Sequence, residues 1–241
     1  MFPLRDVNPT VTSPWVTVAL IALNLGVFLG IQVPSSNQAA LLLERAAIAC
    51  EVTTGAPISL QEVTSGRCDA AALDPVVPDK DIRLSVLTSL FLHGGLAHVL
   101  FNMWFLWIFG NNVEEAFGSI WYLLLYMAGG VAATGAFVLA NPTSTVPLVG
   151  ASGAVAVALG AYAVLFPSHR LLTLVGWIPL PLPASLFLAV WFVAQFALVG
   201  TNIAWEAHAA GFVFGALVAL LFRQRLLARV ERLHPPTPAW P

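Results

Sequence analysis

Six apolar runs constrain the fold of this chain more than any other feature. They cover residues 14–33, 95–110, 119–140, 150–166, 182–200 and 207–223. Each run approaches the roughly 17–25 residues that a helix needs to cross a bilayer. With 59% hydrophobic and 9% charged residues, the chain has more apolar surface than a soluble domain of its size can bury. We therefore expect an all-α fold, a polytopic membrane protein built as a bundle of six transmembrane helices.

The distribution of basic residues predicts the orientation of these helices. Four arginines lie at and beyond the end of the last run, and the positive-inside rule places them in the cytoplasm: Arg223, Arg225, Arg229 and Arg232. An even number of spans returns the N-terminus to the same side. The expected organisation is a cytoplasmic N-terminus (1–13), a membrane domain (14–223) with a long external loop (34–84), and a cytoplasmic basic and proline-rich tail (224–241) whose end is disordered.

Two connecting segments carry further signals. The loop 34–84 holds both cysteines, Cys50 and Cys68, whose spacing permits a disulfide if the loop faces an oxidising compartment. Such a disulfide would stabilise the fold by about 3 kcal/mol, and two unpaired thiols are the alternative. The apolar segment 170–183 is interrupted by three prolines, so we expect a connector at the membrane interface.

Polar residues recur at one depth of the predicted bundle. The second, fourth and sixth helices all run from the outside inward, so their first turns lie close to the outer surface. These turns contain His98 and Asn102, then Ser152, then His208. Polar side chains inside a bilayer usually face the bundle interior. We expect these four side chains to meet beneath the outer face of the membrane.

Small residues provide a way to bring two of these helices together. Ser152, Ala156 and Gly160 repeat every four residues, as do Ala207, Gly211 and Gly215, and such stripes let helix backbones approach closely. Gly150 and Gly153 flank Ser152 and leave its backbone uncrowded. Packing through these stripes would bring Ser152 within hydrogen-bond reach of His208.

A serine and a histidine in contact suggest nucleophilic catalysis. The Ser152 hydroxyl needs a base to accept its proton, and His208 is the usual kind of base. His98, Asn102 and the Ser152 N–H could donate hydrogen bonds to an oxyanion. No carboxylate completes a triad, because Glu206 would point to the other side of its helix.

Each of these residues also has a purely structural interpretation. Ser152 could be a packing residue, His208 a polar bridge between helices, and His98 with Asn102 a polar pair binding one helix to its neighbours. His93 is expected to support the external entrance. Glu114 and Glu115 are expected to cap or brace the start of the third helix.

Three segments together resemble the rhomboid family of intramembrane serine proteases: HGGLAHVLFNMWFLWIFGNNVEEAFG (93–118), GASGAVAVALGAY (150–162) and AHAAGFVFG (207–215). The segment 182–196, with Trp191 and Gln195, resembles the fifth helix of that family. The resemblance implies Ser152 as the nucleophile, His208 as the general base, and His98 and Asn102 as oxyanion donors. It implies no metal or other cofactor, a lateral gate at the fifth helix, and single-span membrane proteins as substrates.

Two departures from the family pattern stand out. The loop 34–84 has no tryptophan and carries Arg67 in GRC, where many members have a Trp-Arg pair. Ala156 replaces a tyrosine that stacks on the histidine in some members. His208 must therefore be positioned in another way, for which tighter helix packing is one explanation.

Three other functions are alternatives to an active protease. An inactive rhomboid-like protein would bind membrane spans without cutting them, a metal protein would use His93, His98 and His208, and a small-solute transporter would show two similar halves, which this chain lacks. The net charge of −2 leaves no basic stripe for a nucleic acid. The expected setting is the lipid bilayer of a bacterial inner membrane, with both termini cytoplasmic and the site open to the external face.

Overall fold

The computed structural model describes residues 1–69, 74–201 and 203–235, and most of these residues are helical. Residues 70–73 of the expected loop and 236–241 of the expected tail lie outside the described residues. The helical elements are α1 (Trp15–Val27), η1 (Phe28–Gln32), α2 (Gln38–Arg45), α3 (Ala49–Thr54), α4 (Leu60–Ser65), α5 (Ile82–Thr88), η2 (Ser89–Phe91), α6 (Leu96–Phe117), α7 (Ser119–Ala140), α8 (Ser152–Leu165), α9 (Ala184–Gln195), η3 (Phe196–Leu198) and α10 (Trp205–Leu233). The strands are β1 (Phe2–Asp6), β2 (Ala47–Ile48), β3 (Pro147–Leu148), β4 (Arg170–Val175) and β5 (Ile178–Pro183).

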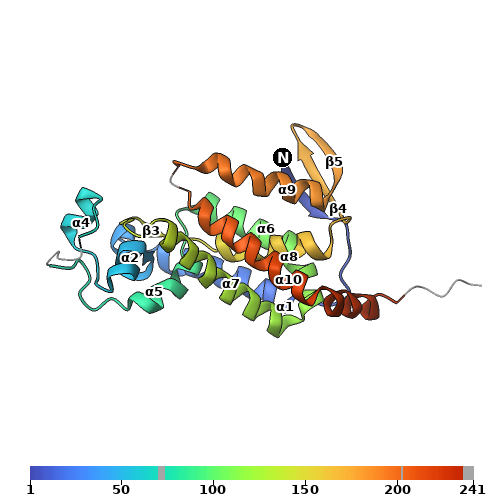
Figure 1. Cartoon of the computed structure of the whole chain (residues 1–241), viewed down its shortest axis with the longest axis horizontal. Coiled ribbons are helices and arrows are strands. Elements are labelled where there is room, and N and C mark those ends of the chain that lie inside the picture. The colour runs from blue at the N-terminus through green and yellow to red at the C-terminus, as the bar shows by residue number, and fades with distance from the viewer. Residues whose placement is uncertain (70–73, 202, 236–241) are drawn as a thin grey trace, which may run out of the picture.

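Each of the six apolar runs contains a helix, and Figure 1 shows these helices side by side along the long axis of the molecule. Among the described residues, three helices are long and apolar enough to cross a membrane: Trp15–Gln32, Ser119–Ala140 and Trp205–Leu233. A fourth span results if Ile82–Phe91 and Leu96–Phe117, which are bent by 77°, act together. Because α8 and α9 are apolar but shorter, the six-span bundle stays a prediction.

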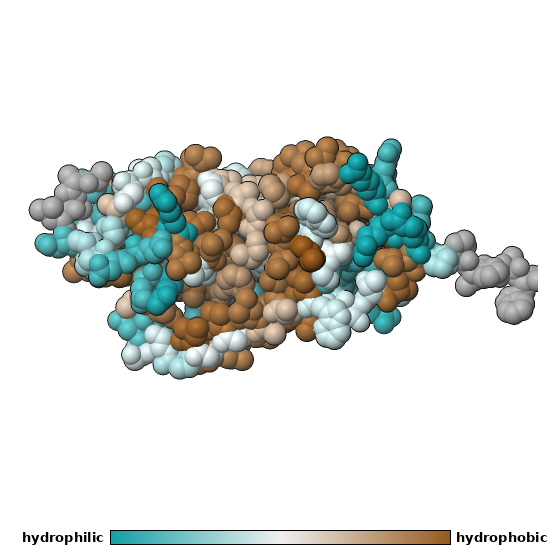
Figure 2. Space-filling model, turned by 90° about the horizontal axis from the view of Figure 1, so that it is seen from below, coloured by the Kyte–Doolittle hydropathy of each residue, from teal (hydrophilic) through white to brown (hydrophobic). Residues whose placement is uncertain are grey.

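The outer surface has the distribution that a bilayer requires. On the face in Figure 2, hydrophobic residues gather over the middle of the molecule, and hydrophilic residues lie mainly towards its two ends. Lipid-facing side chains include Trp121 and Leu139 of α7 and Leu221 of α10, each at least 67% exposed. Apolar side chains exposed in this number would be costly in water and are favourable in lipid.

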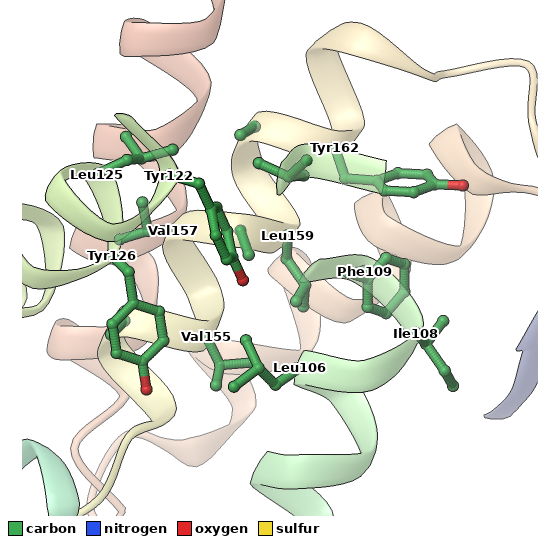
Figure 3. Packing of buried hydrophobic residues seen from close by; sticks show 14 of the residues in the cluster. Leu106, Ile108, Phe109, Tyr122, Leu125, Tyr126, Val155, Val157, Leu159 and Tyr162 are labelled. Atoms are coloured by element: carbon green, nitrogen blue, oxygen red, sulfur yellow. The ribbon is translucent and has the colours of Figure 1, made fainter. Parts of the chain in front are cut away.

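Helix α8 lies at the centre of the core. Its residues from Gly153 to Tyr162 are all buried, as expected for a helix that is apolar on every side. Figure 3 shows Val155, Val157 and Leu159 of α8 packed between aromatic residues of α6 and α7, among them Phe109 and Tyr122. Helix α10 covers the remaining side. The core therefore fixes α8, which begins at Ser152, on several sides.

Glycines set the distance between α8 and α10. A Cβ atom on Gly160 would lie 1.9 Å from the Phe212 carbonyl oxygen, and one on Gly215 would lie 1.9 Å from the Val157 carbonyl oxygen. A Cβ atom on Gly211 would lie 2.2 Å from the Gly153 carbonyl oxygen. The two backbones are thus in direct contact, which only residues without a Cβ allow.

The expected helical bundle is confirmed in its main part, but the described residues also include short strands. Strands β1, β4 and β5 form an antiparallel sheet in that order, so the segment 170–183 is a β-hairpin rather than a simple connector. Strand β5 reads IPLPLP, and its prolines are compatible with a strand because β5 is an edge of the sheet. The sheet lies beside α9 (Figure 1). Strand β1 also contacts α6, because Phe2 stacks on Trp104.

The described part of the loop 34–84 is a small folded unit with short helices. Cys50 and Cys68 form a disulfide. The buried Lys80 ammonium lies 2.5 Å from a carboxylate oxygen of Glu51 and also donates to the carbonyl oxygens of Leu43 and Ala46. Burial lowers the pKa of Lys80, and the contact with Glu51 opposes this shift. The loop therefore has internal supports of its own.

The capping of α4 adds a titratable group to this unit. Glu62 accepts hydrogen bonds from the Ser59 N–H, the Ser59 hydroxyl and the Asp69 N–H. Burial raises the pKa of the Glu62 carboxyl, but these hydrogen bonds outweigh it, so the pKa lies below its usual range.

The opposite end of the bundle is organised by two glutamates. Glu114 accepts from the N–H groups of Val16 and Thr17 at the start of α1, and also from the Ser119 hydroxyl at the start of α7. Glu115 accepts from the N–H groups of Val11 and Thr12. The pair therefore fixes the chain entering α1 as well as the third apolar helix. Helix α10 extends to Leu233, so much of the expected tail is helical.

Candidate active site

A cavity of about 560 Å³ lies between α6, α8, α9 and α10. Four polar residues from the N-terminal parts of three helices line it: His98, Asn102, Ser152 and His208. Trp191 and Gln195 of α9 and Phe101 and Phe105 of α6 also line it. The lining of the cavity thus combines polar side chains with aromatic and apolar ones.

Ser152 and His208 are in hydrogen-bond contact. His208 Nε2 lies 2.8 Å from Ser152 Oγ. Ser152 is the first residue of α8, and His208 lies in the first turn or so of α10. The contact follows from the glycine packing of these two helices, because Gly211 touches Gly153, the neighbour of Ser152.

The other nitrogen of His208 also has a partner. Nδ1 lies 2.8 Å from Gln195 Oε1, and Gln195 Nε2 donates to the Trp191 carbonyl oxygen at 2.9 Å. Gln195 is 5% exposed, and the Trp191 ring lies 6.3 Å from the His208 ring. Glu206, which was not expected to complete a triad, accepts a hydrogen bond from Asn141, the residue directly after α7. The histidine is therefore held by α9 rather than by a carboxylate.

His98 faces the backbone before Ser152. Its Nδ1 accepts a hydrogen bond from the Gly94 N–H, so the proton of the neutral ring lies on Nε2. A Cβ atom on Gly150 would lie 2.9 Å from His98 Nε2, and the φ of Gly150 is 126°, so glycine is needed there for both reasons. The ring thus presents an N–H donor close to Ser152.

Asn102 offers a second donor. It lies one turn beyond His98 on α6 and is 7% exposed. Its amide nitrogen Nδ2 is buried and has no hydrogen-bond partner among the described residues. A buried unpaired donor is costly unless a ligand or an intermediate satisfies it. The Ser152 N–H is a further donor, because the first N–H groups of a helix have no partner within the helix.

His93 lies behind His98 rather than in the cavity. It is buried, and its ring meets the His98 ring edge-on at 5.2 Å. Gln32 holds its backbone, donating to the His93 carbonyl oxygen and accepting from the His93 N–H. Among the described residues, the group with metal-ligand spacing is Cys50, Glu62 and Cys68, and its two sulfur atoms are joined in the disulfide.

Strand β3 connects the external loop to the site. It pairs with β2, so that Ala47 opposes Leu148, and the Cys50 N–H donates to the Ser144 carbonyl oxygen. The Gly150 N–H donates to the Ser89 carbonyl oxygen. The backbone that leads into Ser152 is therefore held from the loop side.

Two contributors to this site were not assigned their contacts from the sequence. The sequence motifs place Gln195 in a segment that resembles the fifth helix of the rhomboid family but assign it no contact, and no motif includes Gln32. A lone amide side chain within an apolar run is the signal that could have found both, because a buried polar group needs a partner.

The fold and the site define a helical bundle with a serine–histidine pair at a cavity among its apolar helices. Residues 82–225 match the family model of the rhomboid domain. The chain belongs to the rhomboid family, as its motifs predicted, and is an integral membrane protein with several apolar helices.

Known relatives include proteins of bacteria and of mitochondria. The rhomboid protease GluP of Bacillus subtilis (strain 168) is 31% identical over 155 residues, which cover 60% of this chain and 29% of the relative. Rhomboid protein 1, mitochondrial, of Saccharomyces cerevisiae is 30% identical over 56% of this chain and 40% of the relative. The rhomboid protease GlpG of Yersinia pseudotuberculosis is 30% identical over 54% of this chain and 44% of the relative. The chain thus spans less than half the length of these three relatives.

Proposed function

We propose that this chain is a serine endopeptidase that cleaves transmembrane segments of other membrane proteins with a Ser152–His208 dyad. The observation that carries the proposal is the 2.8 Å contact between Ser152 Oγ and His208 Nε2, in a cavity that also contains the unpaired amide of Asn102. Two of the relatives above are named proteases, which supports the same activity.

The chemistry follows from these atoms. His208 Nε2 accepts the Ser152 proton while Oγ attacks the carbonyl carbon of the substrate. The resulting oxyanion accepts hydrogen bonds from Asn102 Nδ2, His98 Nε2 and the Ser152 N–H, each stabilising the transition state by about 3 kcal/mol. His208 then protonates the leaving amine, and water hydrolyses the acyl-enzyme. The reaction requires no group beyond these side chains.

The walls of the cavity suggest the route of the substrate. Helices α6 and α9 contact each other through Phe105, Phe109 and Phe187, while Phe101 and Trp191 line the cavity. A substrate helix would enter between α6 and α9 and unwind locally, because helical backbone is shielded by its own hydrogen bonds. We propose a bacterial inner membrane, with both termini cytoplasmic and the cavity open to the external face.

The decisive experiment is cleavage of a model single-span substrate by the full chain in detergent and in liposomes. Ser152→Ala and His208→Ala should each abolish cleavage without changing thermal unfolding, whereas Ser65→Ala, a change of an exposed loop serine, should have no effect. Cleavage by Ser152→Ala at the parent rate would refute the mechanism. If the parent cuts nothing and a fluorophosphonate probe does not label Ser152, the chain is a rhomboid-like binding protein without protease activity.

A further inference from the structure

We infer that Gln195 is the positioning residue for His208, filling the place that a carboxylate occupies in a Ser-His-Asp triad; this rests on the proposed function. A base can accept the Ser152 proton at Nε2 only if the proton of its neutral ring lies on Nδ1. The hydrogen bonds around Gln195 select that tautomer, and they do so with an uncharged group.

The Trp191 carbonyl oxygen fixes the orientation of the Gln195 amide. Its nitrogen lies 2.9 Å from the Trp191 carbonyl oxygen, which can only accept a hydrogen bond. Reversing the amide would set two oxygens against each other at this distance. Oε1 must therefore be the atom that faces His208 Nδ1 at 2.8 Å.

The Gln195 amide oxygen fixes the tautomer of His208. Because Oε1 has no proton to donate, His208 Nδ1 must carry one, and Nε2 then has a free lone pair directed at Ser152 Oγ. After proton transfer from Ser152, the imidazolium keeps its Nδ1–H bond to Gln195. Its charge is then stabilised by the amide dipole rather than by a carboxylate.

This arrangement also replaces the stacking residue that the sequence lacks. Ala156 is fully buried, and a Cβ atom added to Gly211 would lie only 3.3 Å from the Ala156 Cβ, so α10 leaves no space for a larger side chain at position 156. The ring of His208 is instead oriented from α9, by the Gln195 hydrogen bond and the nearby Trp191 ring. The tight packing of α8 against α10 and the contacts from α9 thus position the His208 ring together.

The test compares three changes on α9. Gln195→Leu removes the acceptor at similar volume, Gln195→Glu keeps an acceptor oxygen, and Val193→Ala is a control because Val193 is 66% exposed and does not line the cavity. We expect Gln195→Leu to lower kcat roughly 10- to 100-fold with little change in KM, because it acts on proton transfer rather than on binding. Gln195→Glu should retain most of the activity, and Val193→Ala all of it.

A spectroscopic readout separates positioning from general damage to the fold. In the ¹⁵N-histidine NMR spectrum, the signals that disappear in His208→Ala report its tautomer, and they should show Nδ1–H in the parent and a mixture in Gln195→Leu. An unchanged tautomer and an unchanged rate of Ser152 labelling by a fluorophosphonate in Gln195→Leu would overturn the inference. If instead the parent itself is not labelled at Ser152, the proposed function fails.

Discussion

The contact between α8 and α10 leads to a sharp prediction for Gly211→Ala. The new Cβ atom would lie 2.2 Å from the Gly153 carbonyl oxygen, whereas Cβ atoms are essentially never found closer than 3.0 Å to another heavy atom. The obstructing atom is backbone, so it cannot rotate away. The two helices must separate locally by roughly 0.8 Å, and overpacking of this kind costs about 1–3 kcal/mol.

The same displacement acts on the dyad. Gly211 lies three residues after His208, and Gly153 directly follows Ser152, so the separation occurs at the level of the site. The Ser152–His208 contact would lengthen from 2.8 Å to roughly 3.6 Å, beyond the range of a side-chain hydrogen bond. We therefore expect the labelling rate of Ser152 to fall at least about tenfold, together with a lower unfolding temperature.

Two other glycines make the measurement specific. Gly215→Ala creates a clash at least as severe, 1.9 Å from the Val157 carbonyl oxygen, about one turn further from His208 than Gly211. Its stability loss should match or exceed that of Gly211→Ala, while its effect on labelling is smaller. Gly135→Ala is the control, because a Cβ there meets nothing within 4 Å. The assays are thermal unfolding in detergent and fluorophosphonate labelling. Parent-like values of both for Gly211→Ala would refute the packing argument.

Three further predictions concern the external loop. Lys80→Met leaves the Glu51 carboxylate buried without its opposite charge, so the loop should become less stable by about 3–5 kcal/mol, and adding Glu51→Leu should restore part of this stability. Limited proteolysis measures both changes. Cys50→Ala should destabilise the loop by about 3 kcal/mol, matched by Cys68→Ala and by reductant acting on the parent; resistance of all three to protease would contradict this. The hydrogen bonds to Glu62 hold the pKa of its carboxyl below the usual range. The stability that they add is complete above about pH 4.3, the pKa of a glutamate in the unfolded chain, and is lost as the pH falls through the lower pKa of the folded state. Amide hydrogen exchange over α4 should therefore rise in acid in the parent and not in Glu62→Gln.

The sequence predicts the apolar helices well because hydropathy over a long window needs no information about partners. The sheet is different. Strand β1 pairs with β4 across more than 160 residues, and the prolines of β5 argue against a strand unless it is known to be an edge. Such pairing depends on where the helices place the segments, which hydropathy does not encode.

The site, like the fold, has one part that the sequence predicts and one part that depends on how the helices pack. The topology alone predicts that Ser152, His208, His98 and Asn102 lie at one depth, and the structure brings all four to one cavity. The role of Gln195 depends on the rotation of α9 about its own axis. That helix is apolar on nearly every side, so no pattern indicates which face meets α10.

Two sets of contacts hold the backbone around Ser152, and they are lost under different conditions. On the membrane side, the glycine contacts with α10 set its distance from His208, and they persist as long as the bundle is folded. On the external side, β3 is held by β2, which belongs to the loop that the disulfide and the Lys80–Glu51 pair stabilise. Loop variants should therefore slow Ser152 labelling only under conditions in which the loop is already open to protease. Slower labelling while the loop still resists protease would mean that the loop acts on the site by a route other than β3.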